Sequence, residues 1–417
     1  MKMTYRPGIV LLLAGALAAC GGGETRWAGT MTDSAGVTIV SNPAVGIWAP
    51  GDEWTFAEEM RIGALEGEAE YQFGQVGFIA LDSKDQIYVT DIQAQHIQVY
   101  APDGSYVRTI GQRGSGPGEF LGAAFVLVGP GDTLLVPDVQ NQRINRFAPD
   151  GSSLGSVRIE LQQGLPILFQ GTDNGVMAQQ VRQFALPGQP AIENPQDAIR
   201  ILAPDGTIQD TLLTFASGET FRLSGGAPQF KFYSAEPAWD INDERLLFAV
   251  NDDYRIGVYS TAGELERVIT KSFERKPVAQ RDKDALMTFL ESAWADAGVP
   301  AEAINQLKQN VSYGESFPAF ATLTTGPAGT TWVQHVQAAS ELSEDEYASW
   351  NPIEDTGGAE WDVFDSQGRY LGLVTMPRRF APRVFRGEDI YGVWRDELDV
   401  QYVVKLRIIG DLGVGAT

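Results

Sequence analysis

Residues 86–104 read QIYVTDIQAQHIQVYAPDG, and residues 133–151 read TLLVPDVQNQRINRFAPDG. The two stretches align without a gap, so that Asp91 matches Asp138 and Tyr100 matches Phe147. Their spacing of about 47 residues lies in the range of roughly 40 to 50 residues that is typical of the blades of a β-propeller. The chain of 417 residues therefore contains a structural repeat and is not a row of unrelated domains.

Each repeat predicts four short strands, because apolar residues alternate along it and an Asp-Gly turn separates its last two strands. In the first repeat we expect strands at residues 77–82, 86–90, 96–100 and 106–111. Degenerate copies follow, and the turn glycines of the series are Gly104, Gly151, Gly206, Gly263 and Gly368. A unit of four strands cannot bury both of its faces alone, so the units must close into a ring. We predict an all-β, six-bladed propeller.

The last blade is predicted to take one strand from the beginning of the chain. Three strands lie near the C-terminus, at residues 381–386, 389–394 and 400–408. EMRIG at residues 59–63, followed by EYQF at 70–73, parallels RTIG at 108–111, followed by GEF at 118–120. Residues 58–63 are therefore expected to form the closing strand of a single propeller domain spanning residues 37–410, which removes a free sheet edge.

Several segments resemble a known repeat. IGQRGSGPGEF at residues 110–120, YVTD at 88–91 and RINRF at 143–147 are similar to the NHL repeat and to the six-bladed propellers that are built from it. The resemblance covers residues 58–160 specifically and residues 165–409 in degenerate form. It implies a family whose members mostly bind other molecules and include a few lyases and lactonases, so it does not imply one activity.

The N-terminus resembles that of a bacterial lipoprotein. Lys2 and Arg6 precede an apolar stretch, residues 9–19, which is too short to span a bilayer and suits a signal peptide. The stretch ends in LAAC, which resembles a lipobox, and Cys20 is the only cysteine of the chain. We expect a signal peptide at residues 1–19, acylation of Cys20 and a flexible tether at 20–36. We also expect a location at the outer membrane, facing the periplasm or the cell surface.

The charge limits the choice of partners. The formal net charge is −23, and it becomes −25 once Lys2 and Arg6 are removed with the signal peptide. Such a surface repels nucleic acids and anionic lipid headgroups, so neither is an expected partner, and the membrane is expected to be contacted through the lipid anchor. A protein, peptide or glycan ligand and a monomeric state remain our expectations for partners.

Three long segments are predicted on one face of the ring, opposite the Asp-Gly turns. They are residues 184–197, 276–310 and 338–360. The second, between blades four and five, carries apolar residues at helical spacing, with Pro277 at its start and Gly298 after its end, and therefore predicts a helical insertion. Such segments either cap the channel mouth or are extra loops that the fold tolerates.

The candidate binding residues stand where the second strands of the blades end, near the channel mouth on that face. They are Asp91, Asp138, Gln180, Asn251, His335 and Trp394, with Arg182 and Arg395 nearby. A mixed set of this kind is typical of a specific pocket, but the same positions also simply finish strands. For the two aspartates, coordination of Ca²⁺ is one reading, and acceptance of backbone N–H bonds in the following turn is the commoner one.

No motif for catalysis is present. The chain has two histidines, too few for a metal-dependent propeller lyase, and we predict no catalytic residue, no metal and no cofactor. His335 as a general base stays an alternative. The sequence favours a membrane-anchored binding or scaffolding propeller. A lactonase-like hydrolase or lyase with a site in the central channel is the alternative, and a structural subunit without a ligand is a third.

Overall fold

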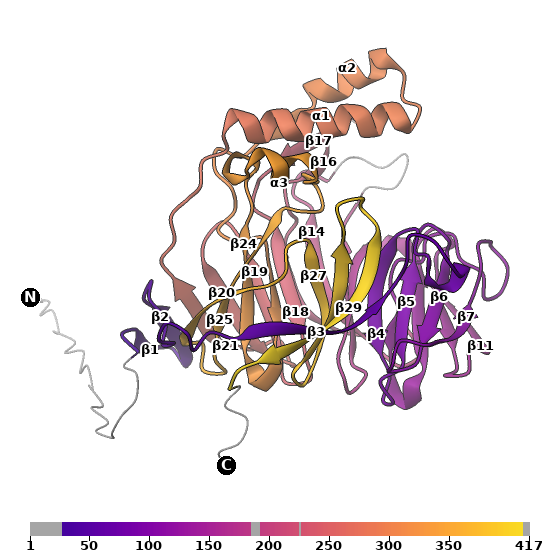
Figure 1. Cartoon of the computed structure of the whole chain (residues 1–417), viewed down its shortest axis with the longest axis horizontal. Helices are drawn as coiled ribbons and strands as arrows, with labels where there is room; N and C mark the ends of the chain where they lie inside the picture. The colour runs from indigo at the N-terminus through magenta and orange to yellow at the C-terminus, as the bar shows by residue number, and fades with distance from the viewer. Residues whose placement is uncertain (1–26, 185–191, 225–226, 412–417) are drawn as a thin grey trace, which may run out of the picture.

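The computed structural model describes residues 27–184, 192–224 and 227–411, and in it the chain forms a six-bladed β-propeller (Figure 1). Blade one contains β4 (Val76–Leu81), β5 (Ile87–Asp91), β6 (His96–Tyr100) and β7 (Tyr106–Ile110). Blade two contains β8 (Leu127–Val128), β9 (Leu134–Asp138), β10 (Arg143–Phe147) and β11 (Ser153–Arg158). Blade three contains β12 (Leu165–Gly171), β13 (Met177–Arg182), β14 (Gln196–Leu202) and β15 (Ile208–Ala216).

The second half of the ring follows the same order. Blade four contains β18 (Pro237–Ile241), β19 (Arg245–Val250), β20 (Arg255–Ser260) and β21 (Leu265–Lys271). Blade five contains β23 (Thr322–Thr325), β24 (Thr331–Val336), β25 (Gly357–Phe364) and β26 (Tyr370–Thr375). Blade six contains β27 (Phe380–Arg386), β28 (Asp389–Arg395), β29 (Gln401–Ile409) and β3 (Thr55–Ile62). The predicted fold class is confirmed.

The ring closes between the two ends of the chain. β3 pairs antiparallel with β29, from Ile62 opposite Val403 to Thr55 opposite Ile409. Residues 58–62 of the expected closing strand lie in β3, which begins three residues earlier. Two indoles in tilted contact back the seam: the ring centres of Trp54 and Trp332 lie 5.8 Å apart, and Trp332 is fully buried.

Before β3, the chain follows the outer edges of two further blades. β1 (Thr30–Ser34) and β2 (Val37–Asn42) form a hairpin, and β2 pairs in parallel with β21 of blade four. The backbone N–H of Trp48 then donates to the carbonyl of Leu371 at the outer edge of blade five. Figure 1 shows this course as one band across the side of the ring, and we call residues 30–62 the N-terminal strap.

The hairpin corrects the expected tether. Residues 30–34, which were assigned to a flexible tether over residues 20–36, form β1. Ala35 and Gly36 have positive φ angles of 56° and 87°, as a two-residue type I′ turn requires, and that turn matches the twist of the paired strands. Val40 of β2 is fully buried against blade four. The part of the tether before Trp27 lies outside the described residues.

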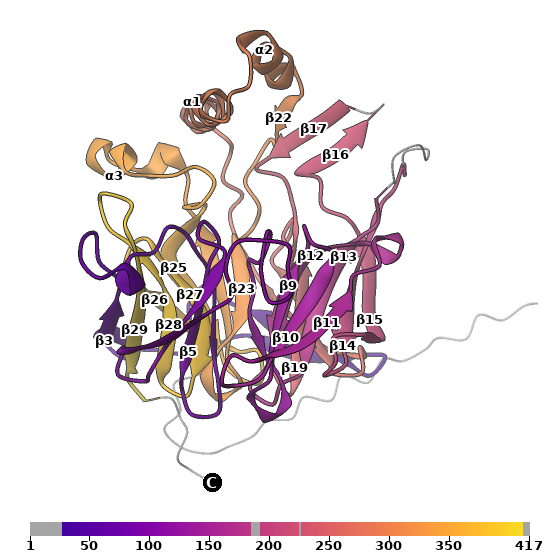
Figure 2. The ribbon, with the colours of Figure 1, turned by 90° about the vertical axis from the view of Figure 1, so that its right-hand side faces the viewer.

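Insertions stand on one face of the ring, opposite the tight turns (Figure 2). Between blades four and five lie α1 (Gln280–Asp296) and α2 (Ala301–Gln309), so the predicted helical insertion is confirmed. β22 (Val311–Tyr313) continues from α2 and joins β16 (Phe221–Ser224) and β17 (Ala227–Phe232) in a small sheet that the sequence did not predict. Residues 185–191 of the expected long segment in blade three lie outside the described residues.

Blade five carries its own insertion between β24 and β25, which we call the blade-five extension (residues 337–356). It contains a 3-10 turn at Ala339–Glu341 and the helix α3 (Glu344–Ala348). The side chain of Asp282, buried at the start of α1, accepts the backbone N–H of Ser340 at 2.9 Å, which ties the extension to the helical insertion. Other 3-10 turns are Ala69–Tyr71, Pro130–Asp132, Leu161–Gln163 and Pro327–Gly329.

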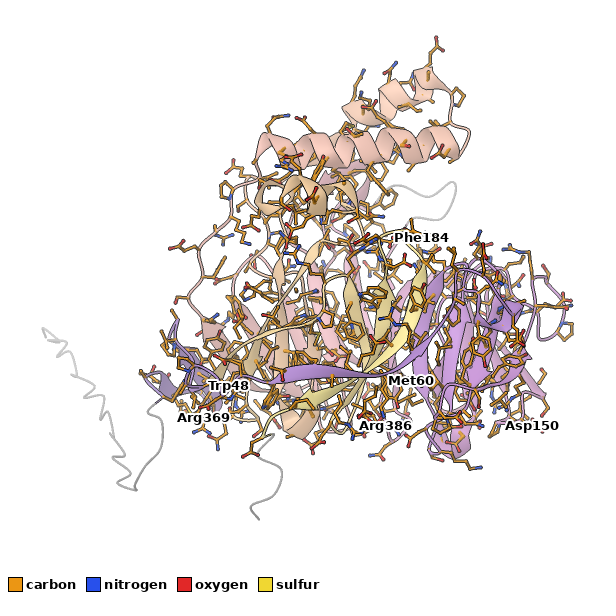
Figure 3. The ribbon with its side chains drawn as sticks, in the orientation of Figure 1. Trp48, Met60, Asp150, Phe184, Arg369 and Arg386 are labelled. Carbon is orange, nitrogen blue, oxygen red and sulfur yellow. The ribbon has the colours of Figure 1, made fainter. Side chains whose placement is uncertain are left out.

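The Asp-Gly turns lie at the end of the propeller opposite these insertions. Figure 3 shows Asp150 and Arg369, which belong to two of the turns, at that end, and Phe184 toward the insertions. Within the part of the chain that the structure describes, no helix is long and apolar enough to cross a bilayer.

Candidate ligand-binding cleft

The repeated aspartates hold loops of the scaffold together. Asp91 is buried and accepts the backbone N–H of Gly74 at 2.7 Å and that of Ala94 at 2.8 Å. Asp138 is also buried and accepts the N–H of Gly122 at 2.9 Å and the side-chain amide of Asn141 at 2.6 Å. Both carboxylates therefore act in the turn role and do not face a ligand site.

Gln180 and Arg182, two further candidates, are engaged inside blade three. Both donate to the buried carboxylate of Asp197, Gln180 at 2.6 Å and the guanidinium of Arg182 at 2.9 Å. The indole of Trp239 donates to the other end of Gln180 at 2.7 Å. These contacts connect blade three to blade four and leave little of either side chain for a ligand.

Asn251 directly follows β19, in the loop between the second and third strands of blade four. It accepts the backbone N–H of Glu236 at 2.7 Å and donates to the carbonyl of Phe320 at 2.8 Å. Only 4% of its surface is exposed. The amide thus links the ends of blades four and five, and the structure does not bring it to an open site.

The remaining three candidates line one cleft. His335 at the end of β24, and Trp394 and Arg395 at the end of β28, border a cleft of about 1060 Å³ between blades five and six, under the blade-five extension. The extension contributes Trp350 to the wall. Further lining residues are Lys276, Glu341, Asp345, Arg378, Arg379 and Glu397. Three of the residues named from the sequence thus lie together, on the face where the sequence predicted the long segments.

His335 is held between two carboxylates. Its Nε2 lies 3.1 Å from Asp362, which is fully buried, and its Nδ1 lies 3.4 Å from Glu360, which is largely exposed. About 30% of the His335 side chain is exposed. An imidazole in this setting is oriented by the buried carboxylate at its back and presents its other edge toward the cleft.

Asp362 is the centre of a buried polar network between blades four and five. It accepts the hydroxyl groups of Tyr254 at 2.6 Å and Tyr370 at 2.7 Å and the ammonium of Lys271 at 2.8 Å. Burial by itself raises the pKa of Asp362, but the hydrogen bond from His335 and the charge of Lys271 outweigh it and hold the pKa well below its usual range. Asp362 is therefore ionised at neutral pH.

The two tyrosines of the network stay protonated. Burial, and then the neighbouring carboxylate of Asp362, raise the pKa of Tyr254 well above its ordinary value, and the same two causes act on Tyr370. Both hydroxyl groups are therefore permanent donors to the carboxylate. Asp362 and Lys271 were not among the predicted residues. A signal that could have identified Asp362 is its position as a charged residue among the apolar residues of the strand sequence WDVF at 361–364.

Trp394 and Arg395 belong to the blade-six wall of the cleft. The guanidinium of Arg61, on the closing strand, lies 4.2 Å from the centre of the Trp394 ring, in a cation–π contact. Arg395 is only 7% exposed and pairs with Asp355, with Glu354 at 2.7 Å and with Asp399 at 3.2 Å. Two of these carboxylates come from the blade-five extension, so Arg395 fastens the extension to blade six.

In the described part of the chain, the positive charges that line the cleft are all paired, whereas some of its negative charges are not. Each lysine and arginine that lines it has a carboxylate partner: Lys276 with Glu341, Arg378 with Glu346, Arg379 with Asp399, and Arg395 as above. Asp345 and Glu397 also line the cleft, and among the described residues neither has a lysine or arginine within ion-pair distance. The cleft thus has negative charge that the protein itself does not neutralise.

The arrangement does not form a nucleophilic site. Among the described residues, no serine, threonine or cysteine side chain forms a hydrogen bond with His335. Nor do three or more histidine, cysteine, aspartate or glutamate side chains within the described ranges gather where they could hold a metal ion. The geometry offers an aromatic, acidic cleft with one oriented imidazole, which suits binding.

Comparisons with known proteins agree with the fold. A family model described as a 6-bladed beta-propeller (DUF5128) matches residues 56–162. Among solved structures, the chain is similar to a Bacteroides fragilis protein described as a candidate exported protein, with 12% identity over 89% of this chain and 99% of that one and a TM-score of 0.50. A DUF4221 family member from Bacteroides vulgatus matches with 12% identity over 86% and 99% of the two chains, also at a TM-score of 0.50.

A virginiamycin B lyase from Staphylococcus aureus is similar at a TM-score of 0.42, with 12% identity over 86% of this chain and 100% of that one. No curated protein matches the sequence. At these identities the likeness shows the six-bladed fold and no activity.

Proposed function

We propose that this protein is a ligand-binding propeller anchored to the bacterial cell envelope through acylated Cys20, and that its ligand site is the cleft between blades five and six. The observation that carries the proposal is the cleft itself, about 1060 Å³ in volume, which exists because blade five has an extension that a simple four-stranded blade lacks. The lipobox-like LAAC at residues 17–20 supports the anchor. A location at the outer membrane, facing the periplasm or the cell surface, is part of the proposal.

The charges and the indoles of the cleft favour a ligand of one chemical class. An anionic ligand would have to displace the carboxylates that already pair with the cleft's cations. A cationic ligand instead meets Asp345 and Glu397, which have no such partner in the part of the chain that the structure describes. Trp350 and Trp394 offer aromatic surface beside this charge, and Leu398 on the rim is 73% exposed. We infer that the ligand is a polypeptide segment that carries lysine or arginine next to apolar residues.

Fluorescence anisotropy with two dye-labelled peptides tests this inference. One peptide alternates lysine with leucine, and the other has glutamate in place of each lysine. The mature chain from Gly21 onward, without the acyl group, should bind the basic peptide, and the binding should weaken as salt is raised. Equal binding of the acidic peptide would contradict the proposed ligand class.

A matched pair of variants locates the contact. Glu397→Gln removes an unpaired carboxylate from the cleft rim, and it should weaken binding by about 2- to 5-fold, as expected for one partly exposed ion pair of roughly 0.5–1 kcal/mol. Glu302→Gln removes the same charge from α2, outside the cleft, and should leave binding unchanged. If both variants bind alike, the ligand lies elsewhere.

A hydrolase is the second candidate, because His335 has a buried carboxylate behind its Nε2 and an edge toward the cleft. In that reading His335 activates a water molecule for attack on an ester or lactone. His335→Gln should then abolish any lactone hydrolysis that the wild-type protein shows. A wild-type protein without such hydrolysis leaves binding as the function of the cleft.

A further inference from the structure

The described chain begins only seven positions after Cys20. Trp27 is already tied to the propeller, because its indole N–H donates to the side chain of Asn42 at 3.1 Å. Asn42 in turn donates to the carbonyl of Gly368 at 2.9 Å and accepts the backbone N–H of Tyr370 at 2.7 Å, both in blade five. Trp27 therefore sits at the outer rim of the ring, where blades four and five meet.

The reach of the connection is short compared with the propeller. Seven residues span at most about 25 Å when fully extended, and roughly 15 Å on average as a flexible chain. Strands of five to seven residues make the ring about 17–23 Å thick, and a layer of helices adds about 10 Å. An anchor at Cys20 thus holds the rim close to the surface in which the acyl chains are embedded.

The rim and the cleft lie at different places on the molecule. Figure 1 shows β1 and β2 at the side of the ring in its lower part, and α1, α2 and α3 at the opposite, upper end. The strap also exposes apolar side chains, Met31 at 41% and Val45 at 79%, near the point where the chain leaves the propeller. Exposed apolar side chains beside an anchor suit contact with a lipid surface.

We propose that the N-terminal strap is the membrane-facing surface of this propeller, and that it docks the rim of blades four and five on the lipid bilayer while the cleft and the helical insertion point away from it. The proposal rests on the acylation of Cys20 that is part of the proposed function. Its consequence is that the cleft is open to partners in the aqueous compartment and closed to the lipids of the anchoring leaflet.

Energy transfer to the bilayer measures this orientation. An azide-bearing residue in place of Asp33, in the hairpin of the strap, or in place of Glu302, in α2, accepts a donor dye and leaves Cys20 for the anchor. Vesicles of uncharged phosphatidylcholine carry an acceptor-labelled lipid, because the acidic protein repels anionic headgroups. We expect transfer to be severalfold more efficient from position 33 than from position 302. Equal transfer from both positions, or more from 302, would overturn the proposal.

Two forms of the protein separate the anchor from the orientation. The acylated protein should float with the vesicles in a flotation assay. Protein that does not float would contradict the membrane anchor of the proposed function. Non-acylated protein coupled through the Cys20 thiol to a maleimide lipid gives the same geometric test without natural acylation. As a control, a long Gly-Ser insertion after Gly23 removes the restraint that the short tether imposes. A difference in transfer that persists supports contact of the strap with the bilayer, and a difference that vanishes overturns that contact.

Discussion

Replacing Asp362 by asparagine should destabilise the propeller more than any other isosteric substitution in the polar network around it. The carboxylate is fully buried and accepts bonds from Tyr254, Tyr370, Lys271 and His335. Asp362→Asn leaves the ammonium of Lys271, which is only 12% exposed, without its counter-charge. It also replaces one carboxylate oxygen, which accepts hydrogen bonds, by an amide NH₂ group that faces the hydrogen-bond donors of the network. Removing one partner of such a buried pair costs about 3–5 kcal/mol.

The expected loss translates into a measurable melting temperature. At roughly 2.1 cal/mol/K per residue, a propeller of about 380 residues has an unfolding entropy near 0.8 kcal/mol/K, so a loss of about 4 kcal/mol lowers Tm by about 5 °C. Differential scanning calorimetry measures this shift. Glu360→Gln, on the same strand but largely exposed, is the matched control and should change Tm by less than about 1 °C.

The pH dependence has a defined sign. The pKa of Asp362 is lower in the folded state than in the unfolded chain, so its stabilisation is complete above the unfolded value of about 3.9 and is lost as pH falls through the folded value. The Tm difference between wild type and Asp362→Asn should therefore be constant from pH 5 to 7 and shrink below about pH 4. Adding Lys271→Met should recover part of the loss. A variant as stable as the Glu360 control would refute this account of the network.

Three further predictions concern the anchor, the ring closure and the cleft. Cys20→Ala should move the protein from the membrane fraction to the soluble fraction of cells lysed without detergent, and retention in the membrane would show another anchor. A chain that begins after Asn42 should lose only a few degrees of Tm by circular dichroism, whereas one that begins after Gly63 lacks β3 and should show no cooperative transition; equal stability of the two would rule out the closing role of β3. Arg395→Met should free the blade-five extension, seen as faster proteolysis within residues 337–356 while the rest of the ring stays resistant, and unchanged proteolysis would mean that Arg395 does not hold it.

The strands and the ring closure could be predicted from the sequence because their signals are local. Alternating apolar residues and Asp-Gly turns set each hairpin, and Gly104 and Gly151 have the positive φ angles that those turns need. The closing strand was found because EMRIG at residues 59–63 copies the outer strand of blade one. The position of a strand within a blade can be predicted when its sequence matches the corresponding strand of another repeat.

The hairpin of the strap could not be placed in this way. β2 pairs with β21, which lies more than two hundred positions away in the chain. The sequence of residues 37–42 contains no feature that identifies β21 as the partner strand. Because strand formation depends on the neighbours that a segment meets, residues 30–34 were assigned to the tether, and residues 37–42 to the start of the propeller domain without a partner strand. The same limit applies to β16, β17 and β22, whose sheet joins two separate loops.

The candidate residues divide according to whether they repeat. Asp91 and Asp138 occupy the same position in successive blades, and both hold the same kind of loop by accepting backbone N–H bonds. A residue that recurs in successive blades serves a need that those blades share, and here that need is the geometry of the connection. His335 and Trp394 occur once each at this position and line the cleft together. Departure from the repeat is not sufficient by itself, because Gln180 and Asn251 also occur once at this position and bind other parts of the scaffold. What distinguishes His335 and Trp394 is the blade-five extension, which encloses a cleft over the ends of their strands.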